Sequence, residues 1–345
     1  MIVTRICSLL AVGLLLALPF SAALHAEEIL SGSALSILTE QPPEPPPGFQ
    51  NAEQAMLAVG LGVVPKVDAD APLPDNVKHT PDIEYGNVDG RSLKLDLYQP
   101  TNVDGPAAGL IFIHGGAWKG GKKEDYRYYC QLFAEKGYVV TSIEYRLLKE
   151  KIYPAAIQDC KCAVRWMRAN ASELGVDPDR LAAIGGSAGG HLSMMVGYSS
   201  DVPRFEGNGG HADVSSAVRC IVNIYGPTDL TTDFVRENEY ANRATREFLG
   251  KRLQEDEALF EEASPITYVD AHDPPTLILH GTIDDIVPIN QGDLLAAKLT
   301  EVGVPYLYDR LPGWPHSMDV AKPVNDRCVW LMERFLAEYL QPADE

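Results

Sequence analysis

Cysteine is scarce in this chain, with six among 345 residues. Cys7 lies in an N-terminal segment that we expect to be removed, which leaves an odd set and at least one unpaired thiol per monomer. The five are Cys130, Cys160, Cys162, Cys220 and Cys328. Cys160 and Cys162 face different directions on a predicted helix, which suits neither a chelate nor a disulfide, and no second cluster supplies zinc ligands. We predict small buried side chains, allow for one disulfide, and expect no metal or other cofactor.

Positive charge is also in short supply. The chain has 29 Lys and Arg residues against 48 Asp and Glu residues, a formal net charge of −19. Arg5 is the only charged residue among residues 1–26, so removal of that segment changes the charge from −19 to −20. Nucleic acids and anionic membrane surfaces are therefore poor partners, although the charge says little about a substrate.

A long apolar run is missing as well. The run Leu9–Phe20 is shorter than the roughly 20 residues that a membrane-spanning helix needs. Arg5 precedes it and the small-residue segment Ser21–Ala26 follows it, which is typical of a secretory signal peptide. Cleavage after Ala23 and cleavage after Ala26 both fit. We predict a signal peptide at residues 1–26, a secreted or periplasmic protein, and no stable membrane insertion after cleavage.

Proline then dominates a short segment. Residues 41–48 read Gln-Pro-Pro-Glu-Pro-Pro-Pro-Gly, which favours an extended polyproline conformation and cannot pair as a strand. The following stretch, Asn51–Pro74, is too short to bury a core of its own. We interpret residues 27–74 as a proline-rich N-terminal arm or linker and residues 75–342 as the main domain.

Strand and helix patterns alternate through that domain. The predicted strands are Ile83–Tyr85, Leu93–Tyr98, Leu110–Ile113, Tyr138–Ile143, Leu181–Ile184, Cys220–Ile224, Thr276–Leu279 and Tyr306–Arg310. The predicted helices are Glu124–Lys136, Pro154–Glu173, His191–Tyr198, Gln291–Gly303 and Pro323–Tyr339. Several strands are continuous apolar runs, as expected for strands buried on both faces. The pattern predicts a doubly wound α/β domain with a mostly parallel eight-stranded sheet, helices on both faces, and a small lid at Thr231–Glu262.

One predicted strand runs into Gly185-Gly186-Ser187-Ala188-Gly189 and then into a helix. A Gly-x-Ser-x-Gly pattern between strand and helix is typical of a nucleophile elbow. Side chains at Gly185 and Gly189 would collide with the neighbouring strand and helix. Ser187 would then project its hydroxyl into open space, and the amide of Ala188, at a helix N-terminus, could stabilise an oxyanion.

A nucleophilic serine needs a base and an orienting carboxylate. Asp284 follows the strand Thr276–Leu279, and His316 follows the last strand, so the order along the chain is serine, acid, histidine. Asp285 is the rival acid. Asp229 fits a turn or cap better than a catalytic role.

The oxyanion loop is predicted at His114-Gly115-Gly116-Ala117-Trp118, directly after the strand Leu110–Ile113. Amides of Gly115 and Gly116, with Ala117 a further candidate, would complete an oxyanion hole with Ala188. Trp118 is either a core residue or a wall of the substrate pocket. The histidines His114, His191 and His280 are interpreted as structural.

These sequence motifs together give the chain a resemblance to a known family. The chain is similar to α/β-hydrolase esterases related to hormone-sensitive lipase, and more closely to secreted acetyl xylan and feruloyl esterase-like (BD-FAE-like) carboxylesterases. The shared phrases are His114–Trp118, Tyr153–Asp159, Gly185–Leu192, Tyr225–Leu230, His280–Asp284 and Gly313–His316. The resemblance implies carboxylic ester hydrolysis with Ser187, Asp284 and His316 as the catalytic triad. Ala117 and Trp118 stand where relatives often carry a third glycine. The alanine side chain narrows the acyl side of the oxyanion loop, which argues against bulky acyl groups.

The expected reaction is acyl transfer through an acyl-enzyme, with activity falling on acidification through roughly pH 6 to 7. Export and resemblance favour short-chain acyl esters, among them acetyl or feruloyl groups on polysaccharides. One alternative is an amide hydrolase of the formamidase type, which shares the same phrases. A second is a binding protein that kept the fold and lost its chemistry, although no triad member is missing here. The oligomeric state stays open.

Overall fold

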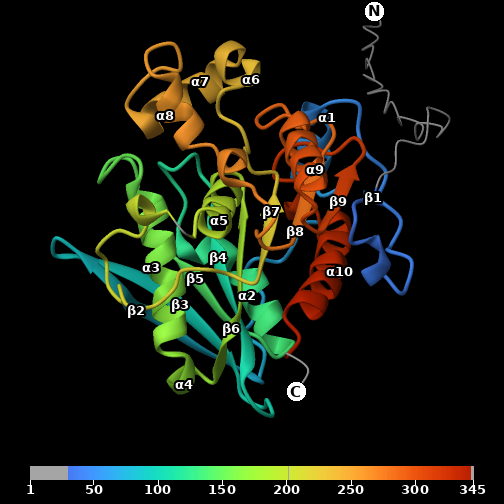
Figure 1. The fold of residues 1–345 in the computed structure, drawn as a ribbon. Helices are drawn as coiled ribbons and strands as arrows, with labels where there is room; N and C mark the ends of the chain where they lie inside the picture. Colours follow the sequence, from blue (N-terminus) through green and yellow to red (C-terminus); the bar gives the residue numbers. More distant parts are fainter. Residues whose placement is uncertain (1–29, 201, 343–345) are drawn as a thin grey trace, which may run out of the picture.

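One nine-stranded sheet organises the part of the chain that this computed structural model describes, residues 30–200 and 202–342 (Figure 1). The predicted signal peptide lies outside these residues. The strand order is β1-β9-β8-β7-β6-β4-β5-β3-β2. The strands are β1 (Leu30–Ser31), β2 (Val77–Val88), β3 (Arg91–Pro100), β4 (Ala107–Ile113), β5 (Val139–Ile143), β6 (Val176–Gly186), β7 (Cys220–Ile224), β8 (Thr276–Gly281) and β9 (Tyr306–Leu311).

The neighbouring strands β5, β4, β6, β7, β8 and β9 are parallel. At the two edges of the sheet, β1 pairs with β9, and β2 and β3 pair with each other and with β5, in antiparallel fashion. The predicted α/β class and mostly parallel sheet are therefore confirmed. The predicted count of eight strands is wrong by one, because the two-residue strand β1 pairs with the edge strand β9 through Leu30 opposite Asp309 and Ser31 opposite Tyr308. Two residues are too few to produce a recognisable strand pattern, so the pairing depends on the edge that β9 offers.

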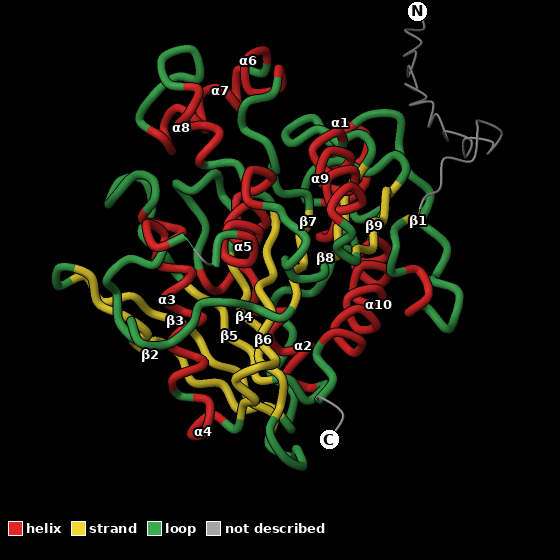
Figure 2. Tube along the Cα trace, viewed as in Figure 1, coloured by secondary structure: helices red, strands yellow, loops and turns green. Residues whose placement is uncertain are grey.

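Helices cover both faces of the sheet (Figure 2). They are α1 (Ala52–Gly60), α2 (Arg127–Glu135), α3 (Ala155–Ala169), α4 (Ala171–Leu174), α5 (Ala188–Tyr198), α6 (Asp233–Glu237), α7 (Glu239–Leu249), α8 (Glu257–Glu262), α9 (Asn290–Val302) and α10 (Lys322–Tyr339). In β4, Leu110 and Phe112 belong to the hydrophobic cluster that contains α2 and α10, whereas Ile111 and Ile113 belong to the cluster with α3, α5 and α9. This alternation explains why β4 is apolar throughout.

The predicted lid folds as the helices α6, α7 and α8, inserted between β7 and β8. These helices lie together at the top of Figure 1, beyond the carboxyl ends of the parallel strands. Loops that follow β4, β6, β8 and β9 converge on the same side, because the carboxyl ends of parallel strands share one edge of a sheet.

The five cysteines that the structure describes are all buried free thiols, so they form no disulfide with one another. None of the helices in the described residues combines the length and apolar character that crossing a membrane requires.

Candidate active site

Ser187 sits on a sharp turn between β6 and α5, with φ 57° and ψ −124°. A Cβ added at Gly185 would lie 2.4 Å from the carbonyl oxygen of Gly189, and a Cβ at Gly189 would lie 1.9 Å from the carbonyl oxygen of Ile113. The predicted collisions are therefore confirmed, and only glycine fits at these two positions. Holding a non-glycine residue in such a conformation costs roughly 1–3 kcal/mol, which the surrounding strands must offset.

The structure brings Ser187, His316 and Asp284 together from three separate loops. The Oγ of Ser187 lies 2.9 Å from Nε2 of His316, and Nδ1 of His316 lies 2.7 Å from Oδ2 of Asp284. The other oxygen of Asp284 accepts hydrogen bonds from the backbone N–H groups of Ile286 and Val287, at 2.9 and 2.8 Å. Since Nδ1 of His316 donates to the carboxylate, Nε2 is free to accept the serine proton.

The two rival carboxylates are placed differently. Asp285 is exposed to solvent, next to the buried Asp284. Asp229 accepts hydrogen bonds from the backbone and the hydroxyl of Thr231, as a turn residue does. Of the three carboxylates, only Asp284 contacts His316.

Asp284 stays ionised although it is buried. Burial by itself would raise the pKa of Asp284, but the neighbouring His280 and the hydrogen bond from His316 outweigh burial and lower the pKa to about 2. His280, predicted to be structural, thus lies beside the carboxylate, with Nε2 3.5 Å from Oδ2 and 2.8 Å from the carbonyl oxygen of Val287.

The loop after β4 presents backbone N–H groups near the serine. The Nδ1–H of His114 donates to the carbonyl of Gly115 at 2.8 Å, and the N–H groups of Lys119 and Gly120 donate to the carbonyl of Gly116. Because carbonyl and N–H point in opposite directions across a trans peptide, the N–H groups of Gly116 and Ala117 face away from these contacts. Within the described residues, neither N–H has an acceptor.

Gly115 packs directly against the elbow. A Cβ at Gly115 would lie 2.8 Å from the carbonyl oxygen of Gly186 and 3.3 Å from Cβ of Ser187. The N–H of Ala188 belongs to the first turn of α5, where N–H groups lack an intrahelical acceptor. The loop and the helix start therefore flank the serine hydroxyl.

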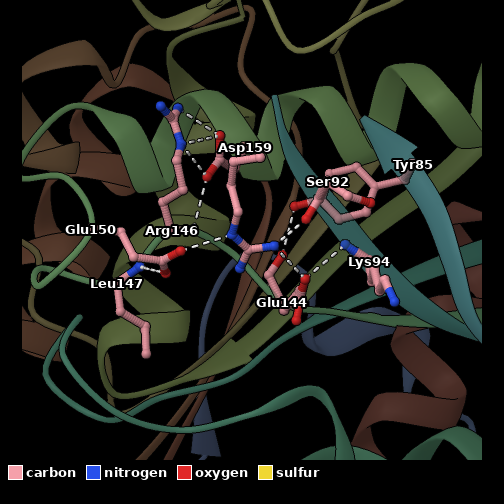
Figure 3. A network of polar contacts seen from close by, with 9 residues as sticks. Tyr85, Ser92, Lys94, Glu144, Arg146, Leu147, Glu150 and Asp159 are labelled. Carbon is pink, nitrogen blue, oxygen red and sulfur yellow. Dashed lines mark hydrogen bonds and ion pairs between the residues drawn. The ribbon is translucent and has the colours of Figure 1, made fainter. Parts of the chain in front are cut away.

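A network of ion pairs and hydrogen bonds links the segment after β5 to β2, β3 and α3 (Figure 3). Asp159, in the shared motif Tyr153–Asp159, forms a bidentate ion pair with Arg146. Glu144 accepts hydrogen bonds from Arg91 and from the backbone of Lys94. Tyr145, between Glu144 and Arg146 in the chain, contacts the predicted oxyanion loop directly. Its hydroxyl donates to the carbonyl of His114 at 3.0 Å, and the two rings stack with 4.3 Å between centroids.

Trp118 is both a core residue and a pocket wall. Its ring is buried, stacks on Phe248 of α7 at 4.3 Å, and donates Nε1–H to Nδ1 of His191 at 3.3 Å. His191 in turn donates to the carbonyl of Ala263. Burial lowers the pKa of His191 to about 4, so this histidine is a neutral structural residue, as expected. Burial also lowers the pKa of His114, although its bond to Gly115 acts in the opposite direction.

A pocket with about 400 Å³ of empty space, part of it open to solvent, lies between Ser187 and the lid. The core side includes Ala117, Trp118 and Ala188. The lid contributes Phe234, Tyr240, Ala241, Ala244 and Thr245, and Leu230 lines the pocket just before the lid begins. None of the described residues that line this pocket is charged. The sequence predicts a lid at Thr231–Glu262 but not which lid residues line the pocket, since the face that a helix turns toward a pocket depends on how the helix packs.

Two residues near His316, Tyr225 and Asp319, had no role assigned from the sequence, although Tyr225 begins the shared motif Tyr225–Leu230. The ring of Tyr225 packs against the imidazole with 4.6 Å between centroids, and its hydroxyl donates to the carboxylate of Asp319. Asp319 also accepts from the hydroxyl of Tyr129 at 3.0 Å. The position of Tyr225 directly after a predicted strand was a usable signal, whereas the contacts of Asp319 come from other elements.

The sheet, the strained serine after β6 and the order of serine, acid and histidine define an α/β hydrolase. Residues 95–299 match the family model described as BD-FAE, and the chain belongs to this family.

Named relatives are ester hydrolases. The chain is 33% identical over 270 residues to the probable carboxylic ester hydrolase LipM of Mycobacterium tuberculosis, covering 75% of this chain and 61% of that protein. It therefore spans about three fifths of the length of this relative. Among solved structures, a truncated carbohydrate esterase from gut microbiota has a TM-score of 0.67 and 27% identity, covering 77% of this chain and 99% of that one.

A thermophilic esterase of Thermogutta terrifontis, Est2, is also similar. In its propionate-bound form it has a TM-score of 0.66 and 27% identity, covering 81% of this chain and all of that chain, 100%. The same esterase phosphorylated by paraoxon has a TM-score of 0.65 and 26% identity, covering 80% and 100% of the two chains.

Proposed function

We propose that this protein is a serine carboxylic ester hydrolase with Ser187 as nucleophile, His316 as general base and Asp284 as orienting acid. The observation that carries the proposal is the continuous hydrogen-bond path from Ser187 through His316 to Asp284, at 2.9 and 2.7 Å. A nucleophile activated in this way needs a base within hydrogen-bond reach and a third group that holds the base.

In the first half-reaction, Oγ of Ser187 bonds to the ester carbonyl carbon while its proton passes to Nε2 of His316. The imidazolium then protonates the leaving alcohol as the carbon–oxygen bond breaks, which produces the acyl-enzyme. In the second half-reaction, His316 takes a proton from water, the hydroxide attacks the acyl carbon, and Ser187 regains its proton as the acid departs. Asp284 stabilises the imidazolium in both steps.

The oxyanion is stabilised by backbone N–H groups. Ala188 supplies one donor from the start of α5. Gly116 and Ala117 are supported as further donors, because the carbonyls of Gly115 and Gly116, in the same peptide groups, point the other way and neither N–H group has an acceptor in the described residues. Gly115 is the remaining predicted donor, and it lies against the elbow. Donors held in place before reaction stabilise developing charge without reorganisation.

The substrate class is a short-chain acyl ester, with acetyl or feruloyl esters on polysaccharides as the natural form. The uncharged pocket beside Ser187, with Ala117 and Trp118 on its core side, suits a small apolar acyl group. Similar solved structures include a carbohydrate esterase and a propionate-bound esterase. Export after removal of residues 1–26 would bring the catalytic domain, residues 75–342, to extracellular polymers.

Activity of Ser187→Ala against nitrophenyl acetate, butyrate, octanoate and ferulate esters and acetylated xylan tests the proposal. Ser172→Ala, at an exposed serine of α4, is the matched control. We expect the control to retain full turnover and Ser187→Ala to lose about 10⁴-fold or more. Full ester turnover in Ser187→Ala would refute the mechanism. Serine-dependent turnover of aryl formamides but not esters would favour the amide hydrolase.

A further inference from the structure

The proline-rich arm contacts the loop that carries His316. Within the predicted arm or linker, residues 27–74, we call residues 43–67 the arm. We call residues 312–321 the histidine loop. The carbonyl of Pro46 accepts a hydrogen bond from Nε1–H of Trp314 at 3.1 Å, and the N–H of Phe49 donates to the carbonyl of Gly313 at 2.7 Å. The ring of Phe49 meets the Trp314 ring edge-on, with 5.4 Å between centroids. A polyproline segment suits such contacts, because its backbone carbonyls have no hydrogen-bond partners within the segment and can accept from other loops.

The arm returns to the histidine loop on the other side of His316. After α1, the N–H of Val67 donates to the carbonyl of Val320 at 3.0 Å, and the N–H of Lys322 donates to the carbonyl of Pro65 at 2.8 Å. Lys66 pairs with Ala321 as an antiparallel bridge. The arm therefore holds the loop at Gly313–Trp314, before His316, and at Val320–Lys322, after it.

The inner side of the histidine loop rests on the loop that carries Asp284. The N–H of Gly313 donates to Oγ1 of Thr282 at 2.9 Å, and the N–H of Ile283 donates to the carbonyl of Trp314 at 3.3 Å. The histidine loop thus lies between the acid loop and the arm. Trp314, only 2% exposed, is covered in part by the arm.

We propose that the arm is a positioning element of the active site, which holds the histidine loop so that His316 stays within hydrogen-bond reach of both Ser187 and Asp284. The proposal rests on the proposed role of His316 as general base. Surface loops are the more mobile parts of a fold, and a displacement of about 1 Å at a catalytic group can reduce the rate by roughly 100-fold. Backbone contacts on both sides of the imidazole limit such displacement.

Two glycines of the N-terminal region provide a matched test. A Cβ at Gly48 would lie 2.0 Å from the carbonyl oxygen of Pro312 and 2.6 Å from Cα of Gly313, so Gly48→Ala must push the arm away from the histidine loop. A Cβ at Gly60, at the end of α1, meets nothing within 4 Å, so Gly60→Ala is the control. Phe49→Ala removes the ring on Trp314 without a clash, and Phe49→Tyr restores the ring.

Steady-state kinetics on nitrophenyl acetate and hydrogen exchange of the full chain are measured together. We expect kcat of Gly48→Ala and Phe49→Ala to fall roughly 10- to 100-fold with KM within about twofold, and amides of residues 312–321 to exchange faster. Gly60→Ala and Phe49→Tyr should match the parent protein in both measurements.

Unchanged kcat in both Gly48→Ala and Phe49→Ala would overturn the positioning role, whether or not hydrogen exchange becomes faster. A fall in kcat with unchanged hydrogen exchange in the histidine loop would also overturn it. Full activity in His316→Ala would refute the proposed function itself. That result is distinguishable, because the exchange measurement needs no catalysis.

Discussion

Asp284→Asn tests the proposed triad most sharply, because the structure dictates how the new amide must lie. Oδ1 of Asp284 accepts two backbone N–H groups, from Ile286 and Val287. An asparagine keeps both bonds only if its carbonyl oxygen takes that place. Its NH₂ group then replaces Oδ2 and faces Nδ1 of His316, 2.7 Å away in the parent protein.

This arrangement forces the wrong tautomer. Nδ1 of His316 must accept from the amide, so the ring proton moves to Nε2, which faces Oγ of Ser187 and can no longer take the serine proton. The same exchange in a serine protease lowers kcat about 10⁴-fold with the geometry intact. At 1.36 kcal/mol per tenfold, this corresponds to about 5 kcal/mol of transition-state stabilisation.

The assay is hydrolysis of nitrophenyl acetate at about pH 8, with thermal unfolding as a check of the fold. Asp285→Asn is the control, since its carboxylate is exposed and makes no contact with His316 among the described residues. We expect the control to stay within about twofold of the parent protein. Retention of more than about a tenth of kcat in Asp284→Asn, or a comparable loss in Asp285→Asn, would refute the assignment of the acid.

Three further outcomes are expected. Burial lowers the pKa of His191 to about 4, so between pH 6.5 and 4 the unfolded chain binds a proton that the folded protein does not. The free energy of unfolding should therefore fall by about 3 kcal/mol over this range. Urea titrations measure this loss, and an equally steep loss in His191→Gln would contradict it. Ala244→Phe should fill the pocket and lower kcat/KM for butyrate esters about 10- to 100-fold more than for acetate; equal losses would count against a pocket for the acyl group. Arg327→Met leaves the buried Asp309 without its ion-pair partner at 2.7 Å and should lower the free energy of unfolding by about 3–5 kcal/mol. The double variant Arg327→Met/Asp309→Asn should recover part of this loss. A urea midpoint of Arg327→Met like that of the parent protein would contradict the prediction.

Features that depend on neighbouring residues could be predicted from the sequence. The glycines around Ser187 are required by steric contacts within a few residues and the adjacent strand, so their spacing alone predicted the elbow. Apolar runs predicted the central strands, because burial on both faces demands them. Element ends were less predictable: β2 begins at Val77 rather than Ile83. The helix predicted from Pro154 to Glu173 is divided into α3 and α4 at Asn170, whose side chain bonds to the carbonyl of Trp166.

Choices between equivalent candidates needed the tertiary structure. Asp284 and Asp285 are adjacent and chemically identical, but in the folded protein Asp284 is buried and contacts His316, whereas Asp285 is exposed. Trp118 could be core or pocket wall, and packing against α7 makes it both. The arm is similar: its prolines predicted an extended segment, but its contacts with Gly313 and Val320 join residues more than 250 positions apart. The fold class and a short set of candidate reactive residues were predictable from the sequence alone, since both follow from local sterics and apolar periodicity. Contacts between distant segments decided which of those residues meet.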